Sequence, residues 1–154
     1  MEQRIRDWLI DKGITLEEAS ARQLYTHAAM VCEANQIFNL TGFQTVEDII
    51  DNLELESIRP FLGMNVPRGT RVADCGSGAG YPGIPFAIYF KDVNVVLFES
   101  SEKKCDFLET VVKSLGLSRV EVVSGRIEEE LQGFRESFDF VLSRAMAQYY
   151  VAIE

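Results

Sequence analysis

Apolar residues recur at helical spacing through residues 1–62, which therefore read as an N-terminal helical region. A first helix is expected to end at Gly13. A second helix is expected to open at a capping box formed by Thr15 and Glu18. A third helix, capped by the hydroxyl of Thr45, completes this predicted region.

The period of the apolar pattern changes after the turn-rich segment at 63–69. Strands are expected at 70–75, 93–99, 119–123 and 138–143, and helices between them at 83–90, 101–116 and 126–132. Strands that are apolar on both faces and separated by helices predict an α/β chain whose parallel sheet has helices on both sides. We expect two parts, a helical region at 1–62 and a sheet-forming part at 63–154.

Composition narrows the class of protein. The 154 residues are 47% apolar and 25% charged, which is typical of a globular chain, and the net charge of -9 argues against a non-specific nucleic-acid binder. No segment is long and apolar enough to be read as a membrane span or a signal peptide. The three cysteines form no C-x-x-C pair, so we expect a reduced, cytoplasmic protein without a disulfide framework or a metal site.

The most specific stretch is DCGSGAGYPG at 74–83, which directly follows the first expected strand. In an open α/β sheet, ligands bind beyond the carboxyl ends of the strands, and glycines there allow positive φ and close approach of a ligand to the main chain. Glu99 closes the second expected strand and can accept from the two hydroxyls of a ribose. The segment therefore predicts a site for a nucleoside-bearing cofactor, with Gly76, Gly78 and Gly80 against it.

Spacing alone leaves the cofactor open. Gly78, Gly80 and Gly83 satisfy the dinucleotide fingerprint G-x-G-x-x-G, which favours a nicotinamide dinucleotide oxidoreductase. Asp74 precedes the first glycine by two residues, and its carboxylate would disfavour a pyrophosphate but suit the sulfonium and amine of S-adenosylmethionine. We favour the methyl donor. A truncated module that binds a cofactor without turnover is a third reading.

Several segments occur in the order found in one known family. They are NLT at 39–41, RVADCGSGAGYPGIPFAI at 71–88, LFES at 97–100, KKCDFL at 103–108, GRIEE at 125–129 and FDFVLSRAMA at 138–147. With these segments the chain resembles the glucose-inhibited division protein B family, bacterial methyltransferases of small-subunit ribosomal RNA. The glycine loop followed by PGIP is the most specific of these matches.

The resemblance implies a Rossmann-like methyltransferase fold behind a small N-terminal helical region, with S-adenosylmethionine as cofactor and 7-methylguanosine as product. It implies a ribosomal RNA or small-subunit partner. The cofactor contacts that it implies fall on Gly76, Tyr81, Ile127, Glu128 and Arg144.

Further polar residues are candidates for contact with the substrate. Arg144 follows an apolar strand and is expected beside the cofactor, where a guanidinium suits a carboxylate or a guanine edge. Arg126 is a candidate for phosphate, and Asn39 either lines the substrate cleft or makes a local turn. Lys103 and Lys104 either contact RNA phosphate or pair with nearby acids.

Methyl transfer to guanine N7 needs no strong general base, because N7 carries a free lone pair and no proton. Positioning and water exclusion are therefore expected to dominate catalysis. This fits a chain with one histidine, His27, which we expect on a helix away from the glycine loop as a surface or packing residue.

The chain also departs from the family pattern. Leu53 stands where the family usually has a histidine, and Glu56 replaces an aspartate. The sequence stops soon after the fourth expected strand, so we expect the C-terminal strands of the family to be missing. The fourth strand would then be an exposed edge, open to self-association.

Overall fold

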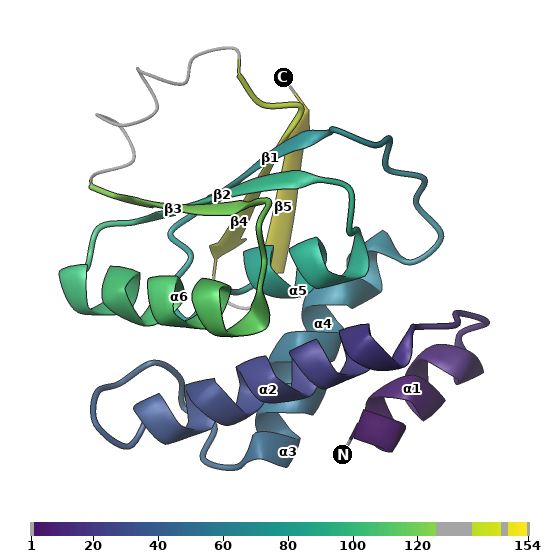
Figure 1. Ribbon diagram of the computed structural model, residues 1–154, viewed down its shortest axis with the longest axis horizontal. Coiled ribbons are helices and arrows are strands. Elements are labelled where there is room, and N and C mark those ends of the chain that lie inside the picture. The colour runs from purple at the N-terminus through teal and green to yellow at the C-terminus, as the bar shows by residue number, and fades with distance from the viewer. Residues whose placement is uncertain (1, 126–136, 146–147, 154) are drawn as a thin grey trace.

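The computed structural model describes residues 2–125, 137–145 and 148–153 (Figure 1). The N-terminal region is helical, as the sequence predicts. Its elements are α1 (Glu2–Asp11), α2 (Glu18–Ala34), α3 (Val46–Ile49), the π-helical turn η1 (Ile50–Glu54), α4 (Leu55–Ile58) and the 3₁₀ turn η2 (Arg59–Phe61).

Two of the three expected helix boundaries are confirmed. Gly13 follows α1 with a φ of 75°, and the Thr45 hydroxyl accepts from the Asp48 amide at 3.1 Å to cap α3. The capping box at Thr15 and Glu18 is wrong, because α2 begins at Glu18 and no side chain caps it. The residue at the N-cap position of α2 is Glu17, so Thr15 precedes that position by two residues.

The second part of the chain forms one five-stranded sheet in the order β3-β2-β1-β4-β5. Its strands are β1 (Arg71–Cys75), β2 (Asn94–Glu99), β3 (Val120–Ser124), β4 (Phe140–Ala145) and β5 (Gln148–Ile153), and its helices are α5 (Gly83–Tyr89) and α6 (Glu102–Leu115). The first four strands are parallel, as predicted, and their bounds differ from the expected ones by one or two residues. The helix expected at 126–132 lies outside the described residues.

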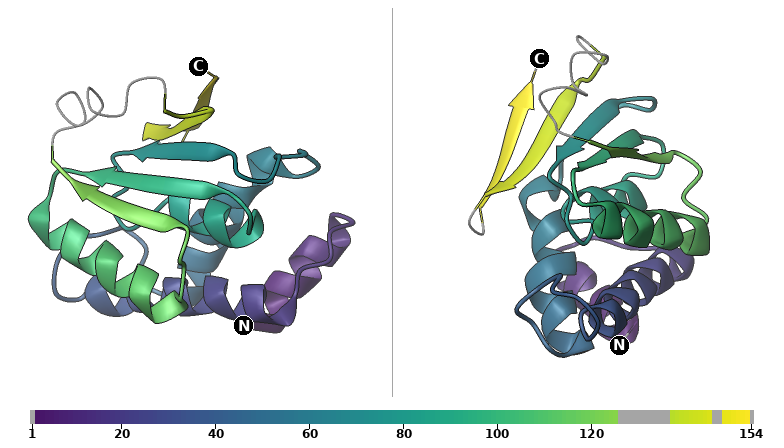
Figure 2. Two further views of the ribbon diagram at one scale, coloured as in Figure 1. Left: turned by 45° about the horizontal axis from the view of Figure 1, so that its top comes forward. Right: turned by 90° about the vertical axis from the view of Figure 1, so that its left-hand side faces the viewer.

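The helices α5 and α6 lie on the same face of the sheet, and the N-terminal helices lie beyond them (Figures 1 and 2). In the part of the chain that the structure describes, no helix covers the other face, so helices on both sides are not found there. That face carries a second apolar cluster of Ala73, Val96, Phe98 and Phe138. The α/β class is nevertheless confirmed.

The expectation that the fourth strand is an exposed edge is wrong. β5 runs antiparallel to β4 and pairs with its whole length, from Phe140 opposite Ile153 to Ala145 opposite Gln148. Antiparallel pairing with β5 satisfies the backbone groups along that edge of β4.

One continuous apolar core joins the N-terminal helices to the sheet. Leu24 and Val31 of α2, Ile84 of α5 and Leu108 of α6 are all fully buried in it. The side chain of Gln23 also reaches across to donate to the carbonyl of Leu115 at 2.9 Å. The helical region is therefore packed firmly under the sheet. No helix among the described residues is long and apolar enough to span a membrane.

Candidate functional site

The glycine loop connects the end of β1 to the start of α5. Its first turn is held against β2, because the amides of Gly76 and Ser77 donate to the carbonyl of Phe98 at 2.9 and 3.1 Å. Gly76, Gly78 and Gly80 have φ values of 75°, 58° and 103°, a region that other residues adopt only under strain. The path of this loop therefore depends on glycine at these positions.

Glu99 bridges the carboxyl ends of the first two strands. Its side chain is 6% exposed; Oε1 accepts from the Gly78 amide at 2.9 Å, and Oε2 accepts from the Ser101 amide at 2.7 Å. Each carboxylate oxygen has a second lone pair and can still accept from a ligand hydroxyl. The structure thus brings Glu99 and the glycine loop together, as the sequence analysis placed them.

The loop has an open side and a packed side. A Cβ added at Gly76 or Gly78 would meet no atom within 4 Å, whereas one at Gly80 would lie 2.5 Å from Ile84 Cδ1 and one at Gly83 would lie 2.6 Å from Asp74 Oδ2. Bare main chain at Gly76 and Gly78 beside the Glu99 carboxylate fits an adenosyl group. Gly80 and Gly83 instead serve the packing of the loop on α5 and β1.

Asp74 lies underneath the loop and does not face solvent. Its side chain is 0% exposed, and Oδ2 accepts from the Gly83 amide at 3.0 Å. Oδ1 is buried without a hydrogen-bond partner among the described residues. Burial raises the pKa of this carboxyl to about 7. The expected direct contact between an ionised Asp74 and a ligand cation is therefore not what its surroundings favour.

The expectation that His27 lies on a helix away from the loop is wrong. His27 is fully buried, and its Nε2 lies 2.9 Å from the carbonyl oxygen of Ala79 within the loop. Its Nδ1 lies 2.8 Å from Oε1 of the buried Glu54, and that same oxygen accepts from the Tyr81 hydroxyl at 2.7 Å. Helix α2 runs beneath the loop, an arrangement that the helical pattern alone does not reveal.

Tyr81 is oriented inward. Its side chain is 3% exposed and directed toward Glu54, so it reaches a cofactor only through its main chain or one edge of the ring. Glu54 and His27 were missed by the sequence reasoning as partners of the loop. The available signal was a polar residue on the apolar face of each helix, at positions otherwise filled by residues such as Leu24 and Ile50.

The remaining candidates are only partly placed. Arg126, Ile127 and Glu128 lie outside the described residues. Arg144 lies in β4 with its main chain opposite Tyr149, next to the strand that leads into the glycine loop, and its side chain is not among those described.

The loop after α2 carries the candidate Asn39, which is exposed. Its conformation is set by a residue that the sequence analysis did not single out. Asn35 Oδ1 accepts from the amides of Leu40 and Thr41 at 2.8 and 3.0 Å, and its Nδ2 donates to the carbonyl of Phe43 at 3.1 Å. An asparagine directly after a helical stretch was the available signal. The side-chain hydrogen bonds that hold this turn, among the described residues, thus come from Asn35.

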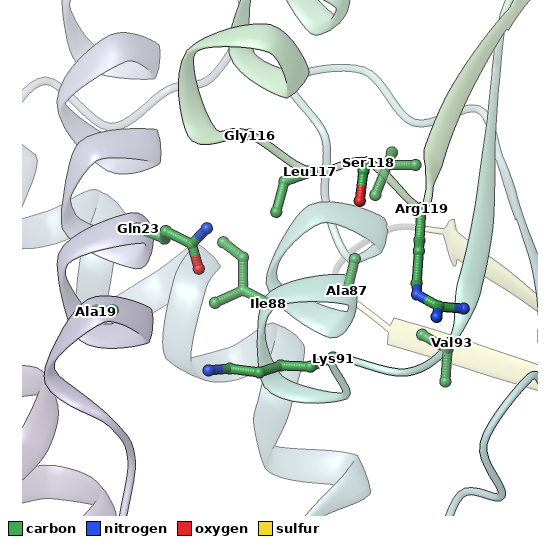
Figure 3. Close-up of a pocket in the computed structure, with 11 residues that line it drawn as sticks. Ala19, Gln23, Ala87, Ile88, Lys91, Val93, Gly116, Leu117, Ser118 and Arg119 are labelled. Carbon is green, nitrogen blue, oxygen red and sulfur yellow. The ribbon is translucent and has the colours of Figure 1, made fainter.

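A cleft of about 310 Å³ opens at the opposite end of the sheet, between α2, α5 and the segment that leads into β3 (Figure 3). Gln23, Ile88, Lys91 and Arg119 are among its lining residues. It lies at the amino ends of the strands and contains no residue of the glycine loop. The candidate site is therefore the loop and its surroundings. Among the described residues, no group of three or more His, Cys, Asp or Glu side chains could hold a metal ion.

Comparison with known sequences gives a consistent set of relatives. Residues 20–154 match the family model of rRNA small subunit methyltransferase G. The protein of that name from Desulfitobacterium hafniense is 40% identical over 144 residues, which are 92% of this chain and 59% of the relative. The one from Moorella thermoacetica is 37% identical over 139 residues, 89% of this chain and 58% of the relative. The chain thus spans less than two-thirds of the length of these relatives.

Solved structures share the fold at low sequence identity. An O-methyltransferase from Bacillus cereus in complex with SAH matches with a TM-score of 0.51 and 20% identity, over 94% of this chain and 63% of that one. A human methyltransferase 10 domain containing protein matches with a TM-score of 0.51 and 18% identity, over 79% and 61%. At such identities the likeness concerns the fold alone.

Proposed function

This chain belongs to the rRNA small subunit methyltransferase G family, and we propose that it transfers a methyl group from S-adenosylmethionine to N7 of a guanine in small-subunit ribosomal RNA. The observation that carries the proposal is the pairing of open main chain at Gly76 and Gly78 with the carboxylate of Glu99. The choice of guanine N7 rests on the family resemblance.

The bound donor would supply an electrophilic methyl group on a sulfonium. Glu99 would hold the ribose through the lone pairs that the loop amides leave free, and the main chain at Gly76 and Gly78 would lie against the adenosine. Gly80 and Tyr81 would complete the loop behind it. No residue here needs to remove a proton, since N7 offers a lone pair, so the chain would act by holding donor and base in line and excluding water.

We assign the remaining roles from the family positions. Ile127 and Glu128 would contact the adenine, and Arg144 would contact the donor carboxylate or the guanine edge, where two parallel hydrogen bonds suit a guanidinium. Arg126 would contact phosphate, and Asn39 would line the substrate cleft. Exposure of Asn39 on the loop after α2 supports its assignment.

Donor binding is the first test, by titration calorimetry with S-adenosylmethionine and with NAD. We expect binding of the methyl donor and none of NAD, because Gly80 and Gly83 of the dinucleotide fingerprint are packed against side chains and offer no open surface. Glu99→Ala should weaken donor binding by at least about tenfold, since it removes charge-assisted hydrogen bonds. Glu102→Ala, an exposed acid three residues away, is the matched control and should bind as the parent does. Equal affinity of the Glu99 variant and the parent would refute the proposed site.

The substrate is tested separately. With a net charge of -9 the chain is poorly suited to bind naked RNA through phosphate alone. We therefore expect a tritiated methyl group to enter assembled small subunits faster than naked ribosomal RNA, in the cytoplasm where such subunits form. Donor binding without incorporation into either substrate would favour a non-catalytic binding module.

We also propose a second copy of the chain as a partner. Among the described residues, β5 is the outer strand of the sheet on that side and pairs with β4 alone. Unpaired strand edges favour association. Sedimentation at increasing concentration tests whether copies associate there.

A further inference from the structure

Three buried polar side chains meet beneath the glycine loop. His27 comes from α2, Glu54 from η1 and Tyr81 from the loop itself, and they are 0%, 0% and 3% exposed. The residues around them belong to the continuous apolar core. This group, called here the His27–Glu54–Tyr81 cluster, has no part in the roles assigned above except for the main chain of Tyr81.

The cluster is tightly connected. Glu54 Oε1 accepts from the Tyr81 hydroxyl at 2.7 Å and lies 2.8 Å from His27 Nδ1, which is an ion-pair distance although the two are not aligned for a hydrogen bond. The imidazole of His27 lies against the ring of Tyr81, with 4.7 Å between the ring centroids. Its Nε2 faces the carbonyl oxygen of Ala79 at 2.9 Å.

Stability gives no reason to keep such a group. Burying a carboxylate costs several kcal/mol, and its contacts recover little more than that cost. Well-packed apolar residues of similar volume are often as stabilising as a buried ion pair, or more so. The positions held by His27 and Glu54 lie on helix faces that are mostly apolar, beside residues such as Leu24 and Ile50. The cluster therefore calls for an explanation other than stability.

The cluster contacts the glycine loop on both sides of Gly80. His27 contacts the carbonyl oxygen of Ala79, and Glu54 accepts from the hydroxyl of Tyr81. Ala79 and Tyr81 are the two residues that flank Gly80. Gly80 has a φ of 103°. A Cβ added to it would lie 3.2 Å from His27 Nε2, so the main chain of the loop packs directly against the imidazole. The opposite side of the same loop, at Gly76 and Gly78, is open. The cluster thus contacts the loop at Ala79 and Tyr81 and leaves the main chain at Gly76 and Gly78 uncovered.

We propose that His27, Glu54 and Tyr81 are positioning residues for the methyl-donor site, which hold the main chain of Ala79–Tyr81 so that Gly76 and Gly78 present an open, preformed surface. This inference rests on the proposed function, because it assigns the donor to that surface. Two of the three residues belong to the N-terminal helices. Those helices then have a function in cofactor binding in addition to packing.

The test compares donor affinity with stability in several variants. His27→Leu keeps a similar side-chain volume but removes the hydrogen bond to Ala79. Tyr81→Phe removes only the hydroxyl that donates to Glu54, so it can test the proposal even if His27→Leu folds poorly. We expect each to weaken S-adenosylmethionine binding by about tenfold in titration calorimetry, because a disordered loop must be reordered on binding. His27→Gln can place an amide nitrogen near the position of Nε2 and should restore affinity to within about threefold of the parent.

Val31→Ala is the matched control. Val31 is fully buried on the same helix, about one turn beyond His27, and has no polar contact with the loop. It should lower the melting temperature of the ligand-free protein without changing donor affinity. If His27→Leu and Tyr81→Phe bind the donor as tightly as Val31→Ala does, or if His27→Gln restores nothing, the cluster has a merely structural role and the proposal is overturned.

A second readout does not need the donor. The amides of Gly80 and Tyr81 both donate to the carbonyl of Ser77, at 2.8 and 3.1 Å, so their hydrogen exchange reports the order of the loop. His27→Leu should accelerate their exchange relative to that of Gly116, which lies at the other end of the sheet. Unchanged exchange in His27→Leu would refute the positioning role even if donor binding is weakened in that variant. If the parent does not bind the donor, the proposed function is wrong. Hydrogen exchange at Gly80 and Tyr81 then still decides whether the cluster orders the loop.

Discussion

At the scale of single residues, the site depends on where a side chain would and would not fit. Gly76 and Gly78 leave open space beside the main chain, while Gly80 and Gly83 leave none. The same residue type therefore has two functions within one loop, one for a ligand and one for packing. Glu99 joins the open part of the loop to β2, because its carboxylate accepts from the amide of Gly78 and keeps lone pairs that a ligand hydroxyl could use.

The packed side of the loop gives a direct test. In Gly83→Ala the new Cβ would lie 2.6 Å from Oδ2 of the buried Asp74, closer than packed atoms allow. We expect a loss of about 2 kcal/mol or more in the free energy of unfolding, measured by chemical denaturation. Gly42→Ala is the control, because a Cβ there meets nothing within 4 Å; its effect should stay within about 0.5 kcal/mol. Similar losses in both variants would contradict the packing argument.

The raised pKa of the buried Asp74 carboxyl predicts that the stability depends on pH. Burial raises its pKa in the folded chain to about 7, from 3.8 for an exposed carboxyl. Between these values the folded chain keeps a proton that the unfolded chain has released, so stability falls as pH rises from about 4 to about 7 and this contribution is constant above.

Asp74→Asn removes this titration while keeping an oxygen that accepts from the Gly83 amide. Its free energy of unfolding, measured by denaturation at a series of pH values, should fall less than that of the parent across this range. Asp106→Asn, at an exposed position of α6, should retain the slope of the parent. An Asp74→Asn curve parallel to that of the parent would mean that the carboxyl titrates normally.

At the scale of elements, helix ends and one helical irregularity place the functional groups. The π-helical turn η1 leads directly into α4, and across this junction the consecutive residues Leu53, Glu54 and Leu55 are all buried. A regular helix on a protein surface has a single inward stripe and does not bury three successive residues. The π-helical turn thus directs Glu54 inward, toward the buried side of the glycine loop. Leu53, at the position where the family usually has a histidine, is itself 1% exposed.

The start of α6 is set by a side chain. The Ser101 hydroxyl accepts from the amide of Lys104, while the main-chain amide of Ser101 donates to Glu99. Ser101→Ala should cost about 1 kcal/mol in the free energy of unfolding, because one amide of the first turn loses its acceptor. The measurement is chemical denaturation, with Ser100→Ala, an exposed neighbour, as control. An unchanged Ser101 variant would show that the cap is not formed in solution.

At the scale of the whole molecule, the N-terminal helices and the sheet form one packed unit. A shared apolar core joins them, and the polar contact between Gln23 and Leu115 as well as the His27–Glu54–Tyr81 cluster cross the same boundary. Such an arrangement transmits the packing of the helices to the loop. The net charge of -9, by contrast, is a property of the surface and bears on partners more than on the fold.

The outer strand gives a prediction at this scale. Removing residues 146–154 would delete β5 and leave the edge of β4 unpaired. We expect the shortened chain to associate at lower concentrations than the parent, because the apolar edge of β4, which β5 covers in the parent, is then open to pairing with a second copy. Light scattering of both forms at equal concentration measures this. Equal particle sizes would show that β5 does not protect the sheet edge.

The sequence by itself determined the alternation of strands and helices after residue 69, the glycine loop at the end of β1 and the acid at the end of β2. These features are local, because apolar period, glycine content and position along the chain specify them without reference to distant residues. Family membership was also readable from the ordered segments.

Tertiary structure alone decided which residues lie behind the loop and how the sheet edge is closed. His27 and Glu54 are 27 positions apart and lie as far from Tyr81, or farther. Only the packing of α2 and η1 under the sheet brings them together. The apolar pattern of β5 likewise does not encode its antiparallel pairing with β4. Apolar periodicity shows which face of a helix or strand is buried, but it does not show which other element packs against that face. Contacts between segments that are remote in sequence are therefore decided by tertiary packing.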